Sequence, residues 1–493
     1  MLPLYLSVLL NGIASLSQEQ DCIIRSVAQD SREAFGGSLF VALKGLNQHG
    51  MDFAVQVQEQ GASAIIWEYD ETVLSPEVLG INIPCIAVKN LRQHLGLIAE
   101  RFYQAPAQSL TMIGITGTDG KTSVSHFLAQ AMDECAVIGT IGIGRLGQLQ
   151  HATHTTPDVL SVHKTLAELK DLGVKTVAME VSSHALDQGR VDNIAFDVAV
   201  LTNLSRDHLD YHKTLEAYAE AKAKLFEPPR LFDLQKSVLN YDDVFGRKTF
   251  KKQGGGLTYG IGLVSDYPSG SLVASDAKFT PKGIHASIHF GEQTGILDAA
   301  VLGRFNLSNL LATLGSMLML GMTLDDALER VNTVATVEGR MEKIPDPRVL
   351  VVVDYAHTPN ALETVLTALR EHTQGKLFCV FGCGGDRDVG KRPLMASVAE
   401  KYADVVIATD DNPRTENPQA IMADIVKGFK QVEKVTIEHD RATAIQLALK
   451  QAVKGDVVLI AGKGHEKVQI LATGTIPFSD KEQATKVLQE LAA

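Results

Sequence analysis

The chain has 493 residues and a mass of 53.2 kDa, a length that predicts about three domains. Its hydrophobic share of 45% and charged share of 21% are ordinary for globular proteins and exclude a disordered or fibrous chain. The formal charge of −12 argues against binding to nucleic acid or to an anionic membrane. Five cysteines are too few for a disulfide scaffold, and no Cys/His set completes a zinc pattern. We therefore expect a protein of the reducing cytoplasm.

The N-terminal stretch Met1–Ala14 is apolar enough to suggest a signal peptide. It lacks the basic residues of a signal peptide, because the first Lys or Arg of the chain is Arg25. We interpret the stretch as a short packed helix. No apolar run reaches the ~18 residues of a membrane span, so no membrane-spanning segment is expected.

The first predicted domain, residues 1–108, is an α/β unit. Its expected strands are Ser38–Leu43, Ala64–Trp67 and Cys85–Val88, with glycine-rich turns and helical stretches between them. Ala105–Ser109 is the predicted linker to the next domain.

The second predicted domain covers residues 109–337. Near-continuous apolar strands alternate with helices, which indicates a parallel sheet covered on both faces. The expected strands are Thr111–Thr116, Thr176–Val181, Asp197–Leu201 and Ser237–Asn240. A glycine-rich, β-like stretch follows at Gly254–Thr280, and the helix Ser308–Met319 closes the domain.

The third predicted domain, residues 338–493, begins around Gly339–Pro347. Strands and helices alternate again, which predicts a doubly wound α/β domain with its sites at the carboxyl ends of the strands. The expected strands are Val349–Asp354, Leu377–Phe381, Val405–Ala408 and Val457–Ala461.

A glycine turn joins the strand Thr111–Thr116 to the predicted helix Ser123–Met132 and ends in Lys121 and Thr122. Glycines let main-chain N–H groups approach phosphates, and the helix N-terminus adds positive potential. Lys121 can reach the outer phosphates, and Thr122 can ligate magnesium. The general phosphate-loop pattern fails where it requires glycine, at Ile115, so a plain turn before a helix is the alternative.

Two strand ends carry further polar groups. Glu180 ends an apolar strand, where a carboxylate can hold magnesium through its oxygens or can simply lie in a surface turn. The next strand ends in Thr202–His212, a loop with more ionisable side chains than a turn needs. His208 lies within it, and a structural histidine is the alternative to a functional one.

The helix Thr214–Phe226 places Lys222 among apolar residues. One stripe at helical spacing contains Leu215, Tyr218, Lys222, Leu225 and Phe226. A buried lysine must be paired, neutral or modified, whereas a lysine that extends its amine to solvent is the alternative. Lys224 points elsewhere and is expected to pair with Glu220.

In the third domain, the strand Val405–Ala408 runs into Asp410-Asp411-Asn412-Pro413-Arg414. Taken alone, Asn412-Pro413 favours a turn in which Arg414 pairs with a nearby acid such as Glu416.

The loop Thr116-Gly117-Thr118-Asp119-Gly120-Lys121-Thr122 resembles the variant phosphate loop of the Mur ligase superfamily, which usually has Asn at the position of Asp119. Members of this superfamily join an amino acid to a carboxylate with ATP. The resemblance implies an α/β protein with a uridine-nucleotide-binding domain, a central phosphate-loop ATPase sheet and a Rossmann-like, doubly wound C-terminal domain.

The resemblance also implies residue roles around ATP and two Mg²⁺ ions. Lys121, Lys222, His208 and Glu180 would be catalytic, and the metal ligands would be Thr122, Glu180, His208 and carbamylated Lys222. The implied ATP-binding residues are Gly117, Thr118, Asp119, Gly120, Lys121, Thr122, Ser123, Asn306, Arg340 and Asp354.

The segments Asp30–Arg32 and Gly45–Gly50 resemble the uridine-nucleotide site of the third amino-acid-adding ligase of this superfamily. Folylpolyglutamate synthetases are similar but begin near their phosphate loop, so they fit the long N-terminal domain poorly. The implied substrate is UDP-N-acetylmuramoyl-L-alanyl-D-glutamate. Its implied contacts are Ser31, Asn47, Gln48, Thr155, Thr156, Ser182, Gln188 and Arg190.

Asp411-Asn412-Pro413-Arg414 resembles the motif of superfamily members that add meso-diaminopimelate. The implied amino-acid site comprises Arg387, Asp411, Asn412, Pro413, Arg414, Gly462 and Glu466. The expected activity is ATP-dependent amide ligation through an acyl phosphate, by a monomer, in cytoplasmic peptidoglycan precursor synthesis. A nucleotide-gated binding module that makes no bond is the alternative from another functional class.

Overall fold

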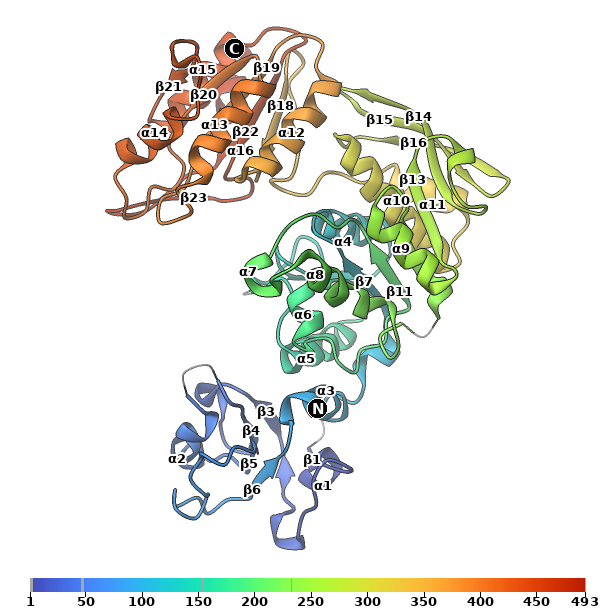
Figure 1. The fold of residues 1–493 in the computed structure, drawn as a ribbon, viewed down its shortest axis with the longest axis vertical. Helices are drawn as coiled ribbons and strands as arrows, with labels where there is room; N and C mark the ends of the chain where they lie inside the picture. The colour runs from blue at the N-terminus through green and yellow to red at the C-terminus, as the bar shows by residue number, and fades with distance from the viewer. Residues whose placement is uncertain (1–2, 46–47, 153, 232, 493) are drawn as a thin grey trace. The chain divides into compact units, whose positions relative to one another are not determined.

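The computed structural model describes residues 3–45, 48–152, 154–231 and 233–492. The chain forms two compact units, Met1–Leu257 and Thr258–Ala493. Each unit is a mixed α/β structure built around parallel strands (Figure 1). The domain limits predicted at 108/109 and 337/338 stay predictions.

The N-terminal unit begins with a small parallel sheet, as its apolar strands predict. In spatial order its strands are β3 (Ser26–Ala28), β4 (Ser38–Ala42), β5 (Ala64–Glu68) and β6 (Cys85–Val88). The helices α2 (Ala54–Glu59) and α3 (Leu91–Phe102) belong to the same region. The expected helix at the N-terminus is confirmed as the short, packed α1 (Leu6–Leu9), whose Leu6 and Leu9 are fully buried.

The larger sheet of this unit carries the phosphate loop. Its parallel strands, in spatial order, are β12 (Ser237–Asn240), β11 (Val198–Leu201), β7 (Thr111–Thr116), β10 (Thr176–Glu180) and β8 (Cys135–Ile138). The strand β9 (Ile143–Gly144) pairs antiparallel with β8. The associated helices are α4 (Lys121–Ala131), α5 (Val159–Asp171), α6 (Ser183–Asp187), α7 (Leu209–His212), α8 (Leu215–Ala223) and α9 (Val244–Gln253). Because parallel strands end at the same edge, the loops after β7, β10 and β11 lie together.

The glycine-rich stretch predicted to be β-like is confirmed, and its β-structure extends to Ala299. The strands are β13 (Leu257–Ile261), β14 (Leu272–Thr280), β15 (Gly283–Phe290) and β16 (Gln293–Ala299). β14, β15 and β16 pair antiparallel. The following helices are α10 (Arg304–Met319), which starts earlier than predicted, and α11 (Leu324–Val331).

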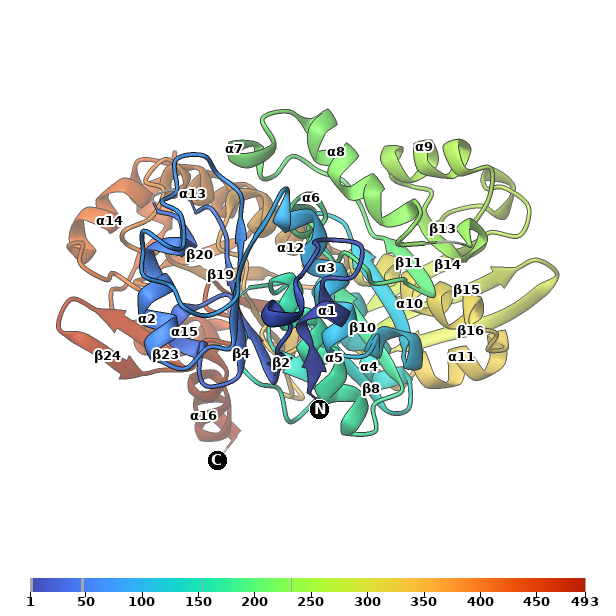
Figure 2. The same ribbon diagram turned by 90° about the horizontal axis from the view of Figure 1, so that it is seen from below.

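The C-terminal sheet is doubly wound, as predicted. In spatial order it contains β17 (Glu342–Ile344), β18 (Leu350–Asp354), β22 (Val457–Ala461), β19 (Leu377–Phe381), β20 (Val405–Ala408) and β21 (Thr436–Ile437). All pairings are parallel except that of β17 with β18. The predicted boundary Gly339–Pro347 therefore contains a strand of this sheet. The hairpin β23 (Val468–Leu471) and β24 (Gly474–Pro477) follows β22 (Figure 2).

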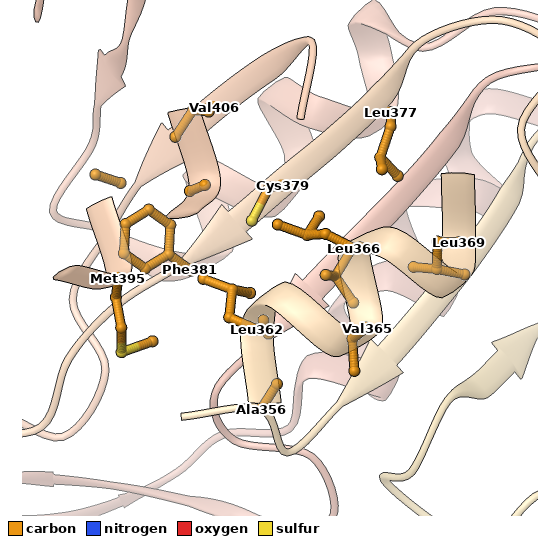
Figure 3. Close-up of a cluster of buried hydrophobic side chains, with 14 of the residues drawn as sticks. Ala356, Leu362, Val365, Leu366, Leu369, Leu377, Cys379, Phe381, Met395 and Val406 are labelled. Carbon is orange, nitrogen blue, oxygen red and sulfur yellow. The ribbon is translucent and has the colours of Figure 1, made fainter. Parts of the chain in front are cut away.

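Helices cover both faces of the C-terminal sheet. One buried cluster takes Leu377, Cys379 and Phe381 from β19, and the cluster on the other face takes the alternate residues Phe378 and Val380. The first face packs against α12 (Pro359–His372), α13 (Lys391–Tyr402) and α14 (Pro418–Val426), and the second against α15 (Arg441–Gln451) and α16 (Asp480–Ala492). Figure 3 shows side chains of α12 directed at those of β19. This burial explains why the strands β19, β20 and β22 are apolar at every position.

Among the residues that the structure describes, no helix combines the length and apolar character needed to cross a membrane.

The packing of α12 gives a stability prediction. Leu366→Ala should lower the free energy of unfolding of the C-terminal unit by about 2–5 kcal/mol, because the fully buried Leu366 would leave a cavity. Chemical denaturation followed by circular dichroism measures this change. The matched control is Leu394→Ala on α13, where the leucine is 57% exposed and little stability should be lost. Equal losses in the two variants would contradict this account of the core.

Candidate active site

The phosphate loop has the backbone geometry that its glycines predict. Gly117 and Gly120 adopt φ angles of 149° and 86°, and an added Cβ at Gly117 would collide with Thr202 Oγ1. The helix α4 starts directly after Gly120. Lys121 folds back over the loop, since its Nζ donates to Gly117 O at 3.0 Å and Thr118 O at 2.8 Å. The loop therefore places an ammonium group beside main-chain N–H groups at a helix N-terminus, an arrangement suited to phosphates.

The segment after β11 holds this loop in place. Asn203 O accepts from Thr118 N at 2.9 Å, and Asn203 Oδ1 accepts from Asp119 N at 3.0 Å. Thr202 Oγ1 donates to Asp119 O at 2.6 Å. The main chain of Asp119 is thus fixed on both sides, whereas its side chain is exposed, so water solvates the charge that departs from the family pattern. The sequence reading missed the role of Asn203.

Glu180 is a buried carboxylate at the end of β10, only 1% exposed. It accepts hydrogen bonds from Thr122 Oγ1 at 3.0 Å, from Thr140 N at 3.0 Å and from Thr140 Oγ1 at 3.1 Å. Burial raises its pKa, and the opposing charge of Lys121 and these hydrogen bonds lower it. A surface-turn carboxylate is therefore the wrong interpretation. Thr140, which the sequence did not single out, completes the group.

Lys222 on α8 is also 1% exposed, so the prediction of a buried lysine is confirmed and a solvent-directed amine is excluded. Its Nζ donates to Gly117 O at 2.7 Å and lies 4.5 Å from the ring centroid of Tyr218. Burial, followed by the charge of Lys121, lowers the pKa of Lys222 well below its usual value. This shift favours the neutral form of the amine, which is the form that can react with carbon dioxide.

Two details predicted for the same helix are wrong. Leu215 is 41% exposed, so the apolar stripe begins only at Tyr218. Lys224 pairs with Asp187 at 2.9 Å rather than with Glu220, because α6 brings a carboxylate from outside the helix.

His208 immediately precedes α7 in the left-handed conformation, with φ at 52°. Its half-exposed ring lies 4.9 Å from the ring of His184 and 6.0 Å from that of Tyr218. Tyr218 in turn places its hydroxyl 3.2 Å from Thr118 Oγ1 in the phosphate loop. These contacts connect His208 to the loop through one aromatic side chain.

Within the described ranges, no three His, Cys, Asp or Glu side chains are grouped so that they could hold a metal ion by themselves. The donors at the phosphate loop are instead the Thr122 hydroxyl, the Glu180 carboxylate and the buried amine of Lys222. Hydroxyl and carboxylate oxygens are hard ligands of the kind that Mg²⁺ prefers, and Mg²⁺ commonly takes only a few ligands from protein and the rest from phosphates and water. The residues present therefore fit magnesium.

The predicted substrate residues of this unit adjoin Glu180. Thr156 Oγ1 donates to Glu180 O at 2.8 Å and accepts from Ser182 N at 3.1 Å. Thr155 and Thr140 share a hydrogen bond of 3.0 Å between their hydroxyl groups. The structure therefore places these predicted substrate residues next to Glu180, whose carboxylate contacts the phosphate loop.

Arg190 forms hydrogen bonds with both Gln188 and Thr156. Arg190 Nη1 donates to Thr156 O at 2.9 Å, and its Nε and Nη2 donate to Gln188 Oε1 at 3.0 and 2.6 Å. Gln188 Nε2 donates to Tyr211 Oη at 3.2 Å. A guanidinium is thus oriented beside the phosphate-loop site.

The remaining predicted substrate residues belong to the N-terminal sheet region. Ser31 is buried at the start of a 3₁₀ turn, and Gln48 is exposed. Asn47 lies outside the described residues. The neighbouring His49 accepts from Met51 N through Nδ1 at 3.1 Å, which fixes the segment after Gln48.

In the C-terminal unit, Asn412 connects two of the predicted amino-acid-site segments. Its Nδ2 donates to Glu466 Oε2 at 2.8 Å, and its Oδ1 accepts from Lys463 Nζ at 2.9 Å and from Ile470 N at 3.0 Å. Gly462, with φ at 121°, packs so closely that an added Cβ would meet the carboxylate of Asp411. The loops after β20 and β22 are therefore joined as the doubly wound topology predicts.

Arg414 is held by the main chain of the loop after β19. Its Nη1 donates to Gly385 O at 2.8 Å, and its backbone has φ at 54°. Glu416 pairs with the buried Arg392 at 2.8 Å, so the expected alternative, an Arg414–Glu416 pair, is wrong. Pro413 is buried, and Arg387 follows Gly385 as an exposed side chain.

Hydrogen bonds hold the side chains of two residues of this unit that are predicted to bind ATP, Asn306 and Asp354. Asn306 is buried, and its Oδ1 accepts from Asn309 Nδ2 at 3.0 Å. Asp354 Oδ2 accepts from Met341 N at 2.8 Å; burial raises the pKa of this carboxyl, whereas the nearby charge of Arg340 lowers it. Their contacts with ATP stay predictions.

Known proteins resemble this chain over nearly its whole length. A Pseudomonas aeruginosa protein named UDP-N-acetylmuramoyl-L-alanyl-D-glutamate--2,6-diaminopimelate ligase is 48% identical over 477 residues, which cover 95% of this chain and 96% of that one. A Coxiella burnetii protein of the same name is 44% identical, covering 98% and 99%. A solved structure with that name is 34% identical and covers both chains fully, with a TM-score of 0.75.

Three family models match in chain order. They describe a Mur ligase family catalytic domain at 23–103, a Mur ligase middle domain at 115–317 and a Mur ligase glutamate ligase domain at 339–464. The chain belongs to the Mur ligase family. Its relatives are named as ligases, which favours a bond-forming Mur ligase over a nucleotide-binding module without catalysis.

The phosphate loop of this Mur ligase gives a direct test. Lys121→Ala should reduce ATP-dependent ligation below about 1% of wild type, because the ammonium that offsets phosphate charge is removed. Phosphate release from ATP, measured with all substrates present, reports the loss. The control is Lys164→Ala on α5, an exposed lysine whose variant should keep full activity. Normal turnover in a folded Lys121→Ala protein would contradict the assignment of this loop to ATP.

Proposed function

We propose that this Mur ligase joins meso-diaminopimelate to UDP-N-acetylmuramoyl-L-alanyl-D-glutamate with ATP, as a monomer in the cytoplasm. The observation that carries the proposal is the buried Lys222, which donates a hydrogen bond to a phosphate loop that also contacts the buried carboxylate of Glu180. The choice of substrates is supported by the names of full-length relatives. The cytoplasm supplies both ATP and the nucleotide-linked substrate.

The reaction needs an activated carboxylate, because a free carboxylate is a poor electrophile. The γ-carboxylate of the D-glutamyl residue attacks the γ-phosphorus of ATP, the bond to the β-phosphate oxygen breaks, and ADP leaves. The amine of diaminopimelate then attacks the acyl phosphate, releasing phosphate and transferring a proton to solvent. Lys121 and the N-terminus of α4 offset negative charge during phosphoryl transfer.

Four side chains would hold magnesium in this proposal: Thr122, Glu180, His208 and Lys222, the last as its carbamate. When bound, Mg²⁺ supplies charge neutralisation and orientation of the phosphate oxygens. Thr140 keeps Glu180 aimed at the loop through two hydrogen bonds. Arg190, fixed by Gln188 and Thr156, presents a cation for the substrate carboxylate.

Arg414 would select the amino acid. Meso-diaminopimelate differs from L-lysine by one distal carboxylate, which a guanidinium can bind with two parallel hydrogen bonds. With lysine bound, Arg414 would be left desolvated and unpaired, at a cost on the order of 2–5 kcal/mol. This difference corresponds to a preference of roughly tens to thousands.

The proposed carbamate on Lys222 predicts loss and partial rescue of activity. Lys222→Ala should abolish ligation, because the site loses an anionic ligand, and millimolar acetate or formate should restore part of the activity. Ligation rates with and without these acids provide the measurement. Lys224→Ala, two residues further along the chain and partly exposed, is the control that should remain active and unaffected by the acids. A fully active Lys222→Ala variant would contradict the proposal.

Substrate choice tests the function itself. Purified wild-type protein with ATP and the UDP-muramoyl dipeptide should release phosphate with meso-diaminopimelate at least tenfold more efficiently than with L-lysine. Arg414→Ala should raise the KM for diaminopimelate by tens to thousands of fold. Its KM values for ATP and the UDP-substrate should stay nearly unchanged.

The matched control for this experiment is Arg370→Ala, a partly exposed arginine of the same unit that pairs with Asp404. It should behave as wild type. Two results would show that Arg414 has only a structural role in the turn. One is a wild-type enzyme that uses L-lysine as efficiently as meso-diaminopimelate, and the other is an Arg414→Ala variant with an unchanged KM for diaminopimelate.

A further inference from the structure

Lys463 is a fully buried ammonium group directly beneath the candidate amino-acid site. It belongs to the loop after β22, between Gly462 and Glu466, and the proposed function gives it no role. A buried ammonium is costly unless it is paired, so its partners define what it does.

Those partners are all residues of the amino-acid site. Lys463 Nζ donates to Asn412 Oδ1 at 2.9 Å and to Glu466 Oε2 at 2.9 Å, and it lies 3.8 Å from Asp411 Oδ1. Within the part of the chain that the structure describes, both hydrogen bonds to the Glu466 carboxylate reach Oε2. The carboxylate is partly exposed, so Oε1 can face an incoming ligand while Oε2 is held from below.

We infer that Lys463 is a positioning residue for amino-acid recognition, which holds Asn412 and Glu466 so that Glu466 presents a carboxylate to the distal ammonium of the substrate. This inference rests on the proposed function, because it names how the same site binds the zwitterionic end of diaminopimelate. Lys463 itself cannot touch the substrate, since none of its side chain is exposed.

A simple anchor for the loop would give the same contacts, so the charge of Lys463 must be tested separately. Burial alone would raise the pKa of Glu466, but the hydrogen bond and charge of Lys463 bring it below its usual value. The other groups that face Glu466 are Asn412, His465, Tyr355, Arg441 and Asp411. Arg441 does not replace the ammonium, because its guanidinium is paired with Asp480.

The experiment compares Lys463→Met with Lys467→Met in the full-length enzyme. Lys463→Met should raise the KM for meso-diaminopimelate about tenfold to a hundredfold and change the KM for ATP and the UDP-substrate less than twofold. The acid limb of its kcat/KM profile for diaminopimelate should move to higher pH, because Glu466 without the ammonium becomes protonated more easily. Lys467 is 70% exposed and only 3.6 Å from Glu338, so Lys467→Met should match wild type in every measurement.

Lys463→Gln is the second variant, which keeps hydrogen-bond donors while it removes the charge. It should fold, show the same pH shift and raise the KM for diaminopimelate less than Lys463→Met. An unchanged KM and pH profile in either folded variant, or an equal rise in all three KM values, would overturn the inference. If the wild-type enzyme does not use diaminopimelate at all, the proposed function is wrong. This result is distinct from a failure of the inference about Lys463, which requires an active wild-type enzyme.

Discussion

A carboxylate that is almost completely withdrawn from water must be hydrogen-bonded, and the bonds of Glu180 organise the N-terminal unit around it. Its side chain binds Thr122 at the start of α4 and Thr140 after β8, while its main-chain oxygen binds Thr156. Hydrogen bonds to this one residue therefore join the phosphate loop, the neighbouring strand end and the segment around Thr156.

Much of this arrangement could be predicted from the sequence, because it follows from chain topology. Apolar strands alternating with helices indicate parallel sheets, and parallel strands bring their loops to one edge. The strands Thr111–Thr116 and Ser237–Asn240 occur at the predicted residues. Helical spacing favoured the burial of Lys222, since its neighbours one turn away are Tyr218 and Phe226, but only the structure excludes an amine directed to solvent.

Contacts made between distant segments could not be predicted in this way. Lys224 pairs with Asp187 of α6, and Glu416 pairs with Arg392 of α13, because a salt bridge depends on which segments pack together. Thr140 carries no motif, and its role is visible only once β8 lies beside β10. Local spacing identifies which face a residue occupies, but the partner across that face is set by tertiary packing.

The left-handed backbone at Arg414 has a consequence for how the enzyme can be stabilised. A residue other than glycine in this region stores about 1–3 kcal/mol of strain, and asparagine or glycine would relieve part of it. A search for thermostable variants would therefore favour replacements at this position. The gain would come with loss of the guanidinium that lies against Gly385. If Arg414 selects the amino acid as proposed, selection for stability at this position would therefore erode activity.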